Sequence, residues 1–91
     1  QARSVNYALV YSDEALRRVL QLRPAARRFR LLRDLERIAA FPSASGDFSV
    51  VDGIGRPNQV TLIEGLLVTW WPDDAMKELR IVSIKPALRG R

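Results

Sequence analysis

The sequence predicts an α+β fold, in which an antiparallel sheet carries a two-helix hairpin on one face. A short strand pattern opens the chain over residues 5–11, and helical periodicity follows over residues 13–41. Further strand patterns, separated by turn residues, occupy residues 47–85. Helices grouped in one part of the chain and strands in another are typical of α+β domains. The predicted order is β-α-α-β-β-β, with room for one more strand, in a single domain that covers residues 1–91.

The opening strand leads directly into the first helix. Every second side chain of residues 5–11 is large and apolar or aromatic, which predicts one buried face. Ser12 stands where a helix N-cap belongs, and Asp13 and Glu14 suit the positive end of a helix. The first helix is therefore expected to end near Leu22.

The second helix is bounded by two prolines. Pro24 suits a first helical turn, where its missing N–H is not needed, and Phe41-Pro42 stops the helix near Ala40. The arginines of this helix could bind RNA or an acidic partner; as the alternative, they form a solvated face in which Arg30 pairs with Asp34 at a spacing of four residues. The two helices, with a short connection, form an antiparallel hairpin. The apolar side of the second helix holds Leu31, Leu32, Leu35, Ile38 and Ala39, and its polar side holds Arg27, Arg30, Arg33, Asp34 and Arg37.

The second half of the chain contains four expected strands. They cover Phe48–Val51, Gln59–Glu64, Leu66–Trp71 and Lys77–Lys85. Both sides of the last two strands are apolar, so either the sheet curls to shield itself or a partner covers its second face. The tail at residues 86–91 is basic.

Two adjacent tryptophans in the third of these strands must face opposite sides of the sheet. Trp70 is in step with Leu66 and Val68, so we predict that it belongs to the core. Trp71 is then a candidate for stacking on a nucleic-acid base, with burial under a partner as the alternative.

The composition narrows the possible chemistry. The chain has no cysteine and no histidine, which removes disulfides, thiolate nucleophiles, the commonest metal ligand and the commonest general base. We therefore expect no metal and no cofactor. No apolar stretch approaches the ~20 residues of a membrane span, and the start has no secretory layout, so the cytoplasm is the expected location.

The net charge of +5 comes mostly from arginine. Such a balance favours a polyanionic or acidic partner, because arginine binds phosphates and carboxylates in bidentate fashion. The alternative is ordinary solubilising charge on a solvated face. Glu64 and Asp52 are candidates for a general base, with structural roles at turns as the alternative reading.

Three segments, in their order, resemble one known group of proteins. These are YALVYSDEALRRVLQL, then LERIAAFPSASGDF, then VTLIEGLLVTWWPDD with LRIVSIKPA. In this order the sequence resembles the RelE/ParE toxin superfamily, the toxin components of bacterial toxin–antitoxin systems that include plasmid stabilisation proteins. The resemblance implies a four-stranded antiparallel sheet with two packed helices and a cognate antitoxin that wraps the toxin. It implies action either on mRNA in the ribosome, by attack of a 2′-hydroxyl on the neighbouring phosphate, or on DNA gyrase.

The residues that cut mRNA in this superfamily are only partly matched. Leu67 stands where some members have an arginine, and Gln59 and Thr61 stand where they have basic residues. Pro86-Ala87 replaces a further arginine, and the terminal tyrosine has no counterpart before Arg91. Three cations are predicted to act on a phosphate. Lys85 and Arg89 lie close to the last of these positions, and Arg56 lies on a glycine-rich turn from which it can reach a phosphate. Residues predicted to bind RNA or a partner are Arg80, Trp71, Arg91, Arg30, Arg33 and Arg37.

Three functional hypotheses follow. The first is a toxin that an antitoxin neutralises and that acts on translation by ribosome-dependent mRNA cleavage. The second is a non-catalytic or degenerate member of the same scaffold that acts as a gyrase-directed or regulatory binding module. The third is a basic nucleic-acid-binding domain unrelated to toxins. None of them involves a membrane, and each leaves a homodimer open.

Overall fold

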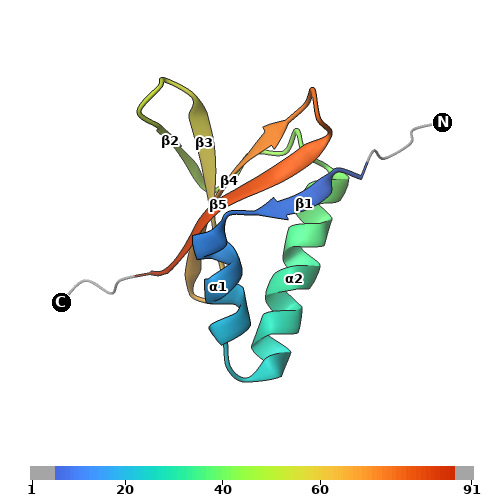
Figure 1. Cartoon of the computed structure of the whole chain (residues 1–91), viewed down its shortest axis with the longest axis vertical. Coiled ribbons are helices and arrows are strands. Elements are labelled where there is room, and N and C mark those ends of the chain that lie inside the picture. The colour runs from blue at the N-terminus through green and yellow to red at the C-terminus, as the bar shows by residue number, and fades with distance from the viewer. Residues whose placement is uncertain (1–5, 88–91) are drawn as a thin grey trace.

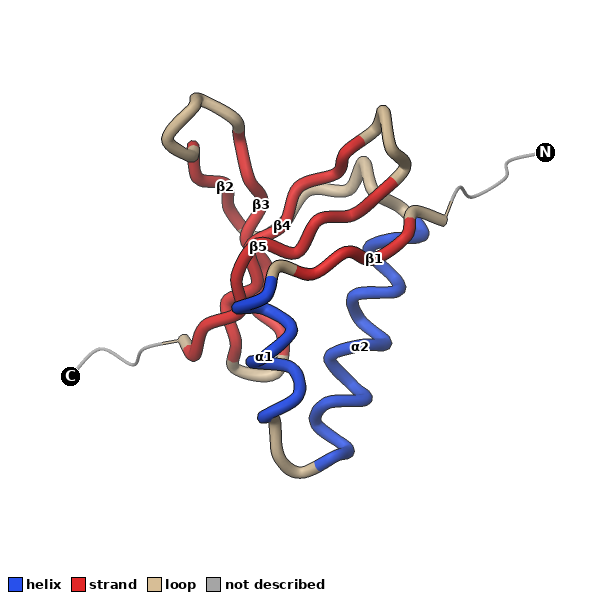
Figure 2. Tube along the Cα trace, in the orientation of Figure 1, coloured by secondary structure: helices blue, strands red, loops and turns tan. Residues whose placement is uncertain are grey.

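The protein, seen in a computed structural model that describes residues 6–87, consists of one sheet with two helices against one of its faces (Figures 1 and 2). Its elements are β1 (Ala8–Tyr11), α1 (Asp13–Gln21), α2 (Ala25–Ala40), β2 (Phe48–Val51), β3 (Pro57–Ile63), β4 (Leu66–Asp73) and β5 (Glu78–Pro86). The predicted α+β class and element order, including the additional strand, are confirmed. Neither helix in the described part of the chain is long and apolar enough to cross a membrane.

The five strands lie in the order β1-β5-β4-β3-β2. The three pairings from β2 to β5 are antiparallel, as expected for strands joined in sequence by short turns. One detail corrects the sequence-based expectation, because β1 runs parallel to β5 and the sheet is therefore mixed. β1 is linked to β5 only through the rest of the chain, so no hairpin turn fixes their relative direction.

The helix boundaries follow the signals seen in the sequence. Ser12 is the N-cap of α1, and its hydroxyl accepts a hydrogen bond from the backbone N–H of Ala15 at 3.0 Å. Pro24 precedes α2, and Phe41 ends it. The opening strand is shorter than predicted: β1 begins at Ala8, and residues 1–5 lie outside the described part of the chain.

The core lies between the helices and the sheet. Trp70 is 1% exposed, and its indole N–H donates a hydrogen bond to the hydroxyl of Thr61 at 3.0 Å. The prediction that Trp70 is the buried tryptophan is therefore confirmed. The other buried members of this core are Ala15, Val19, Leu22, Leu31, Leu35, Ala39, Ile63, Leu66, Val68, Leu79, Ile81 and Ile84.

A bulge in β5 explains why the last strand looked apolar on both sides. Ile81 pairs with Trp70 and Ser83 pairs with Thr69, so Val82 is an extra residue without a partner on β4. The extra residue resets the alternation, and Ile81 and Ile84 both reach the core. The Ser12 hydroxyl donates to the Val82 carbonyl at 2.7 Å, which ties the start of α1 to the bulge.

The β3–β4 hairpin is closed by Glu64 and Gly65. Both residues have positive φ angles, 54° and 76° respectively. Two consecutive residues with positive φ are typical of the type I′ turn, which closes two-residue hairpins because its twist matches that of the two flanking strands. Ile63 therefore pairs directly with Leu66, and this pairing sets which side chains of β3 and β4 face the helices.

Candidate functional site

The strand register places three of the predicted site residues, Trp71, Arg80 and Lys85, on the sheet face that points away from the helices, which we call the free face. Lys85 pairs with Leu67 and Arg80 pairs with Trp71, on the side opposite to the buried Trp70 and Val68. The two pairs stand four residues apart along β4, which is a distance of about 13 Å. Lys85 is exposed, and Arg80 lies at the other end of the free face.

Three of the predicted residues lie together at the Arg80 end of the free face. The guanidinium carbon of Arg56 is 4.0 Å from the centre of the Trp71 ring, and that of Arg80 is 5.9 Å from it. Arg56 comes from the turn between β2 and β3, Trp71 from β4 and Arg80 from β5. We call these three residues the Trp71 cluster. Because Arg56 already stacks on the indole, that face of the Trp71 ring is not open to a nucleic-acid base, and the assignment of Trp71 to RNA binding stays a prediction.

Both arginines of the Trp71 cluster form ion pairs with carboxylates. The Nε of Arg56 lies 3.6 Å from Asp52. Arg80 contacts two acids, with its Nε 3.2 Å from Asp73 and its Nη2 2.7 Å from Glu78. Two guanidinium groups thus face three carboxylates, so this end of the free face is not a site of free positive charge.

The two candidate general bases are engaged at turns. The Oδ1 of Asp52 accepts hydrogen bonds from the backbone N–H groups of Arg56, at 2.9 Å, and Ile54, at 3.0 Å. The first of these hydrogen bonds is the main cause that holds the pKa of Asp52 below its usual value. Glu64 forms an ion pair with Arg30 at 3.0 Å. Both acids have the structural role that was the alternative reading of the sequence.

The arginines of α2 are paired differently from the prediction. Arg30 was expected to pair with Asp34, but it pairs with Glu64 of the β3–β4 turn, which lies beside the helix. Asp34 pairs instead with Arg37 at 3.2 Å. The error arises because spacing along one helix carries no information about a partner from the sheet. Arg33 is exposed and has no ion pair within residues 6–87.

The net positive charge belongs to the helices more than to the sheet. Residues 13–40 contain eight arginines and four carboxylates, whereas residues 42–87 contain four basic and six acidic side chains. The helical pair is therefore the surface that electrostatics favours for an acidic partner. This difference in charge is present in the sequence, but it becomes visible only when the charges of the helices and of the sheet are counted separately.

An apolar hollow of about 550 Å³ lies between α1 and α2. Its lining combines Leu9 and Tyr11 of β1, Leu16, Val19 and Leu20 of α1, and Arg28, Leu32 and Glu36 of α2. Glu36 lines the same hollow as Leu9 and Tyr11 of β1, so it lies at the end of the hollow nearest β1. Burial first, and then the Glu36 carboxylate, raise the pKa of Tyr11.

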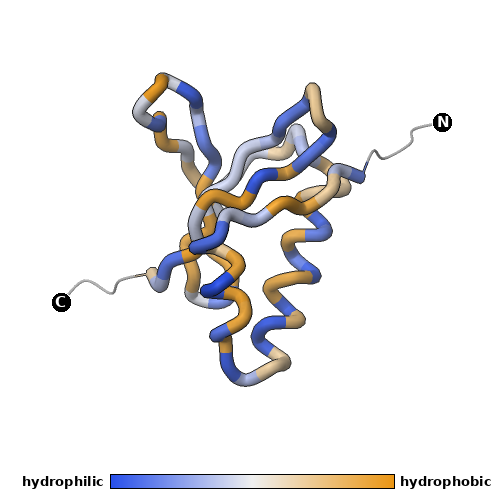
Figure 3. Tube along the Cα trace, viewed as in Figure 1, coloured by the Kyte–Doolittle hydropathy of each residue, from blue (hydrophilic) through white to orange (hydrophobic). Residues whose placement is uncertain are grey.

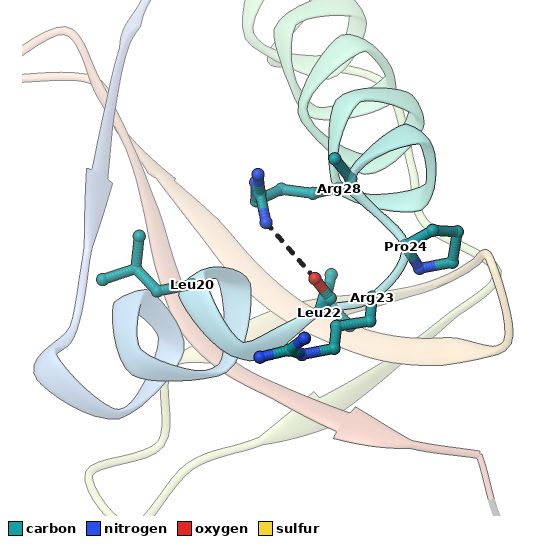
Figure 4. A pocket seen from close by; sticks show the side chains of 6 residues that line it. Leu20, Leu22, Arg23, Pro24 and Arg28 are labelled. Atoms are coloured by element: carbon teal, nitrogen blue, oxygen red, sulfur yellow. Dashed lines mark hydrogen bonds between the residues drawn. The ribbon is translucent and has the colours of Figure 1, made fainter.

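A second hollow continues the first toward the turn between the helices. It shares Leu20 and Arg28 with the first and adds Leu22, Arg23, Pro24 and Ala25 (Figure 4). Figure 4 shows Arg28 reaching from α2 back across this turn, where it donates a hydrogen bond to the Leu22 carbonyl at 3.3 Å. We call the two hollows together the helical groove. The sequence analysis did not predict it, although leucines at positions 16 and 20 are a signal for a second apolar face.

Comparison with solved structures identifies the fold. The crystal structure of an archaeal RelE-RelB complex from Pyrococcus horikoshii OT3 matches with a TM-score of 0.74 and 15% identity, over 93% of this chain and 99% of that chain. The isolated E. coli RelE toxin matches with a TM-score of 0.70 and 17% identity, over 93% of this chain and 88% of that one. The chain has the RelE fold.

A third structure with the RelE fold extends the comparison. The intact E. coli RelBE toxin–antitoxin complex matches with a TM-score of 0.60 and 16% identity, over 91% of this chain and 99% of that chain. No protein-family model and no curated protein matches the sequence. The likeness is therefore one of fold, and it agrees with the superfamily that the sequence resembles.

Gln59 and Thr61 stand where some members of the superfamily have basic residues, and on β3 of this chain both side chains face the helices. The Thr61 hydroxyl bonds to Trp70, and the Gln59 side chain accepts the N–H of Gly46 at 2.8 Å. The residues that β3 turns toward the free face are Asn58, Val60 and Leu62, none of which is charged. β3 therefore adds no cation to the free face.

Within residues 6–87, the predicted catalytic cations do not lie together in one site. Arg56 lies in the Trp71 cluster, and Lys85 lies about 13 Å away along the sheet. Arg89 and Arg91 lie outside the described part of the chain. The assignment of Arg56, Lys85 and Arg89 to catalysis stays a prediction.

Proposed function

We propose that this chain is the toxin of a toxin–antitoxin pair, neutralised by an antitoxin protein. The observation that carries the proposal is the match to RelE structures over nearly the full length of both chains. Two of these structures are complexes, one of RelE with RelB and one called a toxin–antitoxin complex. The resemblance stated from the sequence points to the same class.

The first candidate for the toxic activity is ribosome-dependent cleavage of mRNA in the cytoplasm. Cleavage at a 2′-hydroxyl needs a base, an acid and cations that stabilise the charge on phosphorus. Lys85 supports this candidate, because it is exposed on the free face and has no ion pair among residues 6–87. Arg56 and Arg89 would supply further positive charge to the phosphate.

The second candidate is a toxin that acts by binding alone, directed at DNA gyrase or at a regulatory partner. The pairing of Arg56 and Arg80 with carboxylates favours it, because those guanidinium groups are already neutralised. The uncharged free-face side of β3 and the structural roles of Asp52 and Glu64 favour it as well.

Expression of the chain alone, without any partner protein, tests the proposal. Growth arrest is the expected result, and normal growth with abundant folded protein would contradict a toxin. An in vitro translation assay beside a gyrase supercoiling assay separates the two candidates. Cut message in the first supports cleavage, and inhibition of supercoiling supports binding.

A matched pair of lysine variants sharpens the cleavage test. Lys85→Gln removes the free-face cation, and Lys77→Gln makes the same change at an exposed lysine in the β4–β5 turn. If cleavage uses Lys85, its loss is expected in the first variant only. Equal cleavage by both variants would remove Lys85 from the assignment.

A further inference from the structure

We infer that the outer edge of β2 pairs with the β2 edge of a second copy of this chain, which gives a symmetric dimer with one continuous sheet. The inference goes beyond the proposed function and does not depend on it, because this edge lies apart from Lys85 on β5 and from the helical groove. Four features support it: unpaired backbone groups, exposed apolar side chains, a register that matches itself, and a local charge that allows two copies to meet.

The outer edge of β2 has backbone groups without a neighbouring strand. β2 stands last in the sheet order, so in the described part of the chain it has β3 on one side and no strand on the other. The Asp52 N–H donates to the Arg56 carbonyl at 2.9 Å, directly after the pair Val51–Pro57 in the register. Hydrogen-bonded pairs alternate along an antiparallel ladder, so Val51 and Ser49 direct their N–H and C=O groups outward. These groups can pair with a second strand.

The two edges of the sheet are protected differently. At the β1 edge, the Tyr7 N–H donates to the Ala39 carbonyl of α2 at 2.9 Å, and Leu9 packs against the core. At the β2 edge, no charged residue and no proline stands within Phe48–Val51, and every residue of the strand is exposed. Edge strands usually carry such residues, because they prevent pairing with another chain. Their absence from β2 leaves an edge that is suited to pairing.

Large apolar side chains surround this edge. Phe48 and Val50 are 50% and 42% exposed, and Val51 and Ile54 are 70% and 77% exposed. They lie on the hairpin of β2 and β3, which extends away from both helices (Figure 1). Apolar groups gathered at an exposed strand edge gain free energy when a second chain buries them.

The strand is complementary to its own copy in one antiparallel register. A two-fold axis at Val50 brings Ser49 of each copy opposite Val51 of the other. Because these residues direct their backbone groups outward, each of the two pairs exchanges two hydrogen bonds. Val50 meets Val50 of the second copy at a closely spaced pair without such bonds, since its own N–H and C=O groups point to β3. Phe48 lies diagonal to Val50 of the second copy, on the same face, and can pack against it.

The local charge favours a second copy over a nucleic acid. Residues 43–58 carry two carboxylates and one arginine, whereas residues 13–40 carry eight arginines and four carboxylates. Two copies that meet at β2 therefore keep their positive helices away from the contact. The arginine of the hairpin, Arg56, already pairs with Asp52, so a phosphate backbone finds no free cation there. In the register above, Asp47 stands opposite the uncharged Gly53 of the second copy.

The small size of the contact sets the strength of the dimer. Each copy contributes one strand of four residues and the tip of its hairpin. The buried area therefore stays below the roughly 1,200 Å² of a standard interface, and the expected Kd is on the order of tens of micromolar. The monomer then dominates at low concentration.

Sedimentation equilibrium of the full chain at a series of concentrations tests the inference. The wild type is expected to change from monomer to dimer between about 5 and 500 μM. Val51→Lys places a charge on the outer edge, and Met76→Lys makes the same change in charge at a 60% exposed residue of the β4–β5 turn. The first variant is expected to raise the Kd at least about tenfold, and the second to leave it within about twofold.

A further variant addresses the backbone pairing alone. Ser49→Pro removes an outward N–H and leaves the hydrogen bonds between β2 and β3 in place, which an edge strand tolerates. It is expected to weaken the dimer as Val51→Lys does. A thermal melt checks that each variant folds, so a loss of pairing is not mistaken for a loss of structure.

A cysteine at position 50 reports the register. The chain has no cysteine of its own, so oxidised Val50→Cys can form a disulfide only between two copies. The axis at Val50 places the two Cα atoms about 4.5 Å apart, which is within reach of a disulfide. Rapid cross-linking is expected for Val50→Cys and not for Met76→Cys, the control in the β4–β5 turn.

Three results would overturn the inference. They are a wild type that stays monomeric at about 500 μM, equal effects of the two lysine variants, and equal cross-linking of the two cysteine variants. If the wild type stays monomeric but binds a labelled extended peptide of alternating valine and threonine, the edge belongs to another protein and the inference also fails. None of these measurements depends on growth arrest, so the dimer and the toxin proposal stand or fall separately.

Discussion

The helical pair and the free face of the sheet both carry arginines, but they differ in how many of them contact carboxylates, since on the helices only some do, among them Arg30 and Arg37. On the sheet, Arg56 and Arg80 contact carboxylates and flank Trp71. On the helical pair, Arg23, Arg28 and Arg33 have no carboxylate partner in the described part of the chain. The difference teaches that the number of arginines in a region does not locate a binding surface. Their pairing does.

The helical pair and the sheet also differ in where their exposed apolar residues lie. Along the helical groove, leucines are left exposed beside unpaired arginines. On the sheet side, the exposed apolar residues lie mainly in the β2–β3 hairpin, with Val51 70% and Ile54 77% exposed. Figure 3 shows a short hydrophobic segment at the tip of this hairpin, away from both helices, with hydrophilic residues beside it. Within residues 6–87, exposed leucines and several arginines without carboxylate partners therefore lie together on the helical side, whereas the free face combines the exposed Leu62 with one such cation, Lys85.

The largest expected effect on the free energy of unfolding is the difference between replacing Trp70 and replacing Trp71 in β4. Trp70→Ala should lower the free energy of unfolding by about 3–5 kcal/mol, because it empties a fully buried site. Trp71→Ala removes a half-buried ring and its cation–π contacts, and should cost about 1–2 kcal/mol. Urea unfolding measures both values. Equal costs would mean that the free face is as much a part of the core as the helix side.

The next prediction compares the inner and outer faces of the helical pair. Leu35→Ala should cost about 2–5 kcal/mol because Leu35 is fully buried. Leu20→Ala, at an exposed leucine of the groove, should cost less than about 0.5 kcal/mol. The same unfolding experiment decides the matter. A cost for Leu20→Ala close to that of Leu35→Ala would show that the groove is closed in solution.

A smaller effect distinguishes a paired arginine from an unpaired one. Arg80→Gln should lower the free energy of unfolding by up to about 1 kcal/mol at low salt, because Arg80 is partly exposed and contacts two carboxylates. High salt should reduce this cost by screening the pairs. Arg33→Gln is the matched control and should have no measurable effect. A salt-independent loss in both variants would contradict the assigned pairing.

The smallest effect concerns the Asp52 turn and depends on pH. Hydrogen bonding to the Arg56 N–H lowers the pKa of Asp52 below the ordinary value of 3.8. A lowered pKa in the folded state adds stability above the unfolded pKa, and this stability disappears as the pH falls through the folded value. Stability of the wild type should therefore fall more steeply below pH 3.8 than that of Asp52→Asn. Parallel pH profiles would show that the turn leaves this pKa unchanged.

Much of the fold could be predicted because its signals are local. Ser12 and Pro24 each mark a helix boundary by their own chemistry, and both stand where the sequence indicated. The parallel pairing of β1 with β5 and the bulge at Val82 depend on residues far apart in the chain. No spacing within a single element reports on such contacts.

The candidate site was predicted as residues but not as an arrangement. Arg56, Trp71 and Arg80 were each singled out, but their meeting depends on three separate strand segments. The carboxylates that neutralise the arginines were equally invisible, because Asp73 and Glu78 become neighbours only through the pairing of β4 with β5. The helical groove was missed because the exposure of Leu16 and Leu20 depends on how α1 packs against the sheet and α2, which no spacing within α1 reveals.

The most direct test of the account is a map of where a polyglutamate peptide binds on the full chain, measured by the NMR shifts of the backbone amides. The account predicts changes in α1 and in the first half of α2, with β4 and β5 unchanged, because the arginines without carboxylate partners lie on the helical pair. Changes centred on Trp71, Arg80 and Lys85 would contradict it, since the free face would then be the surface that attracts negative charge.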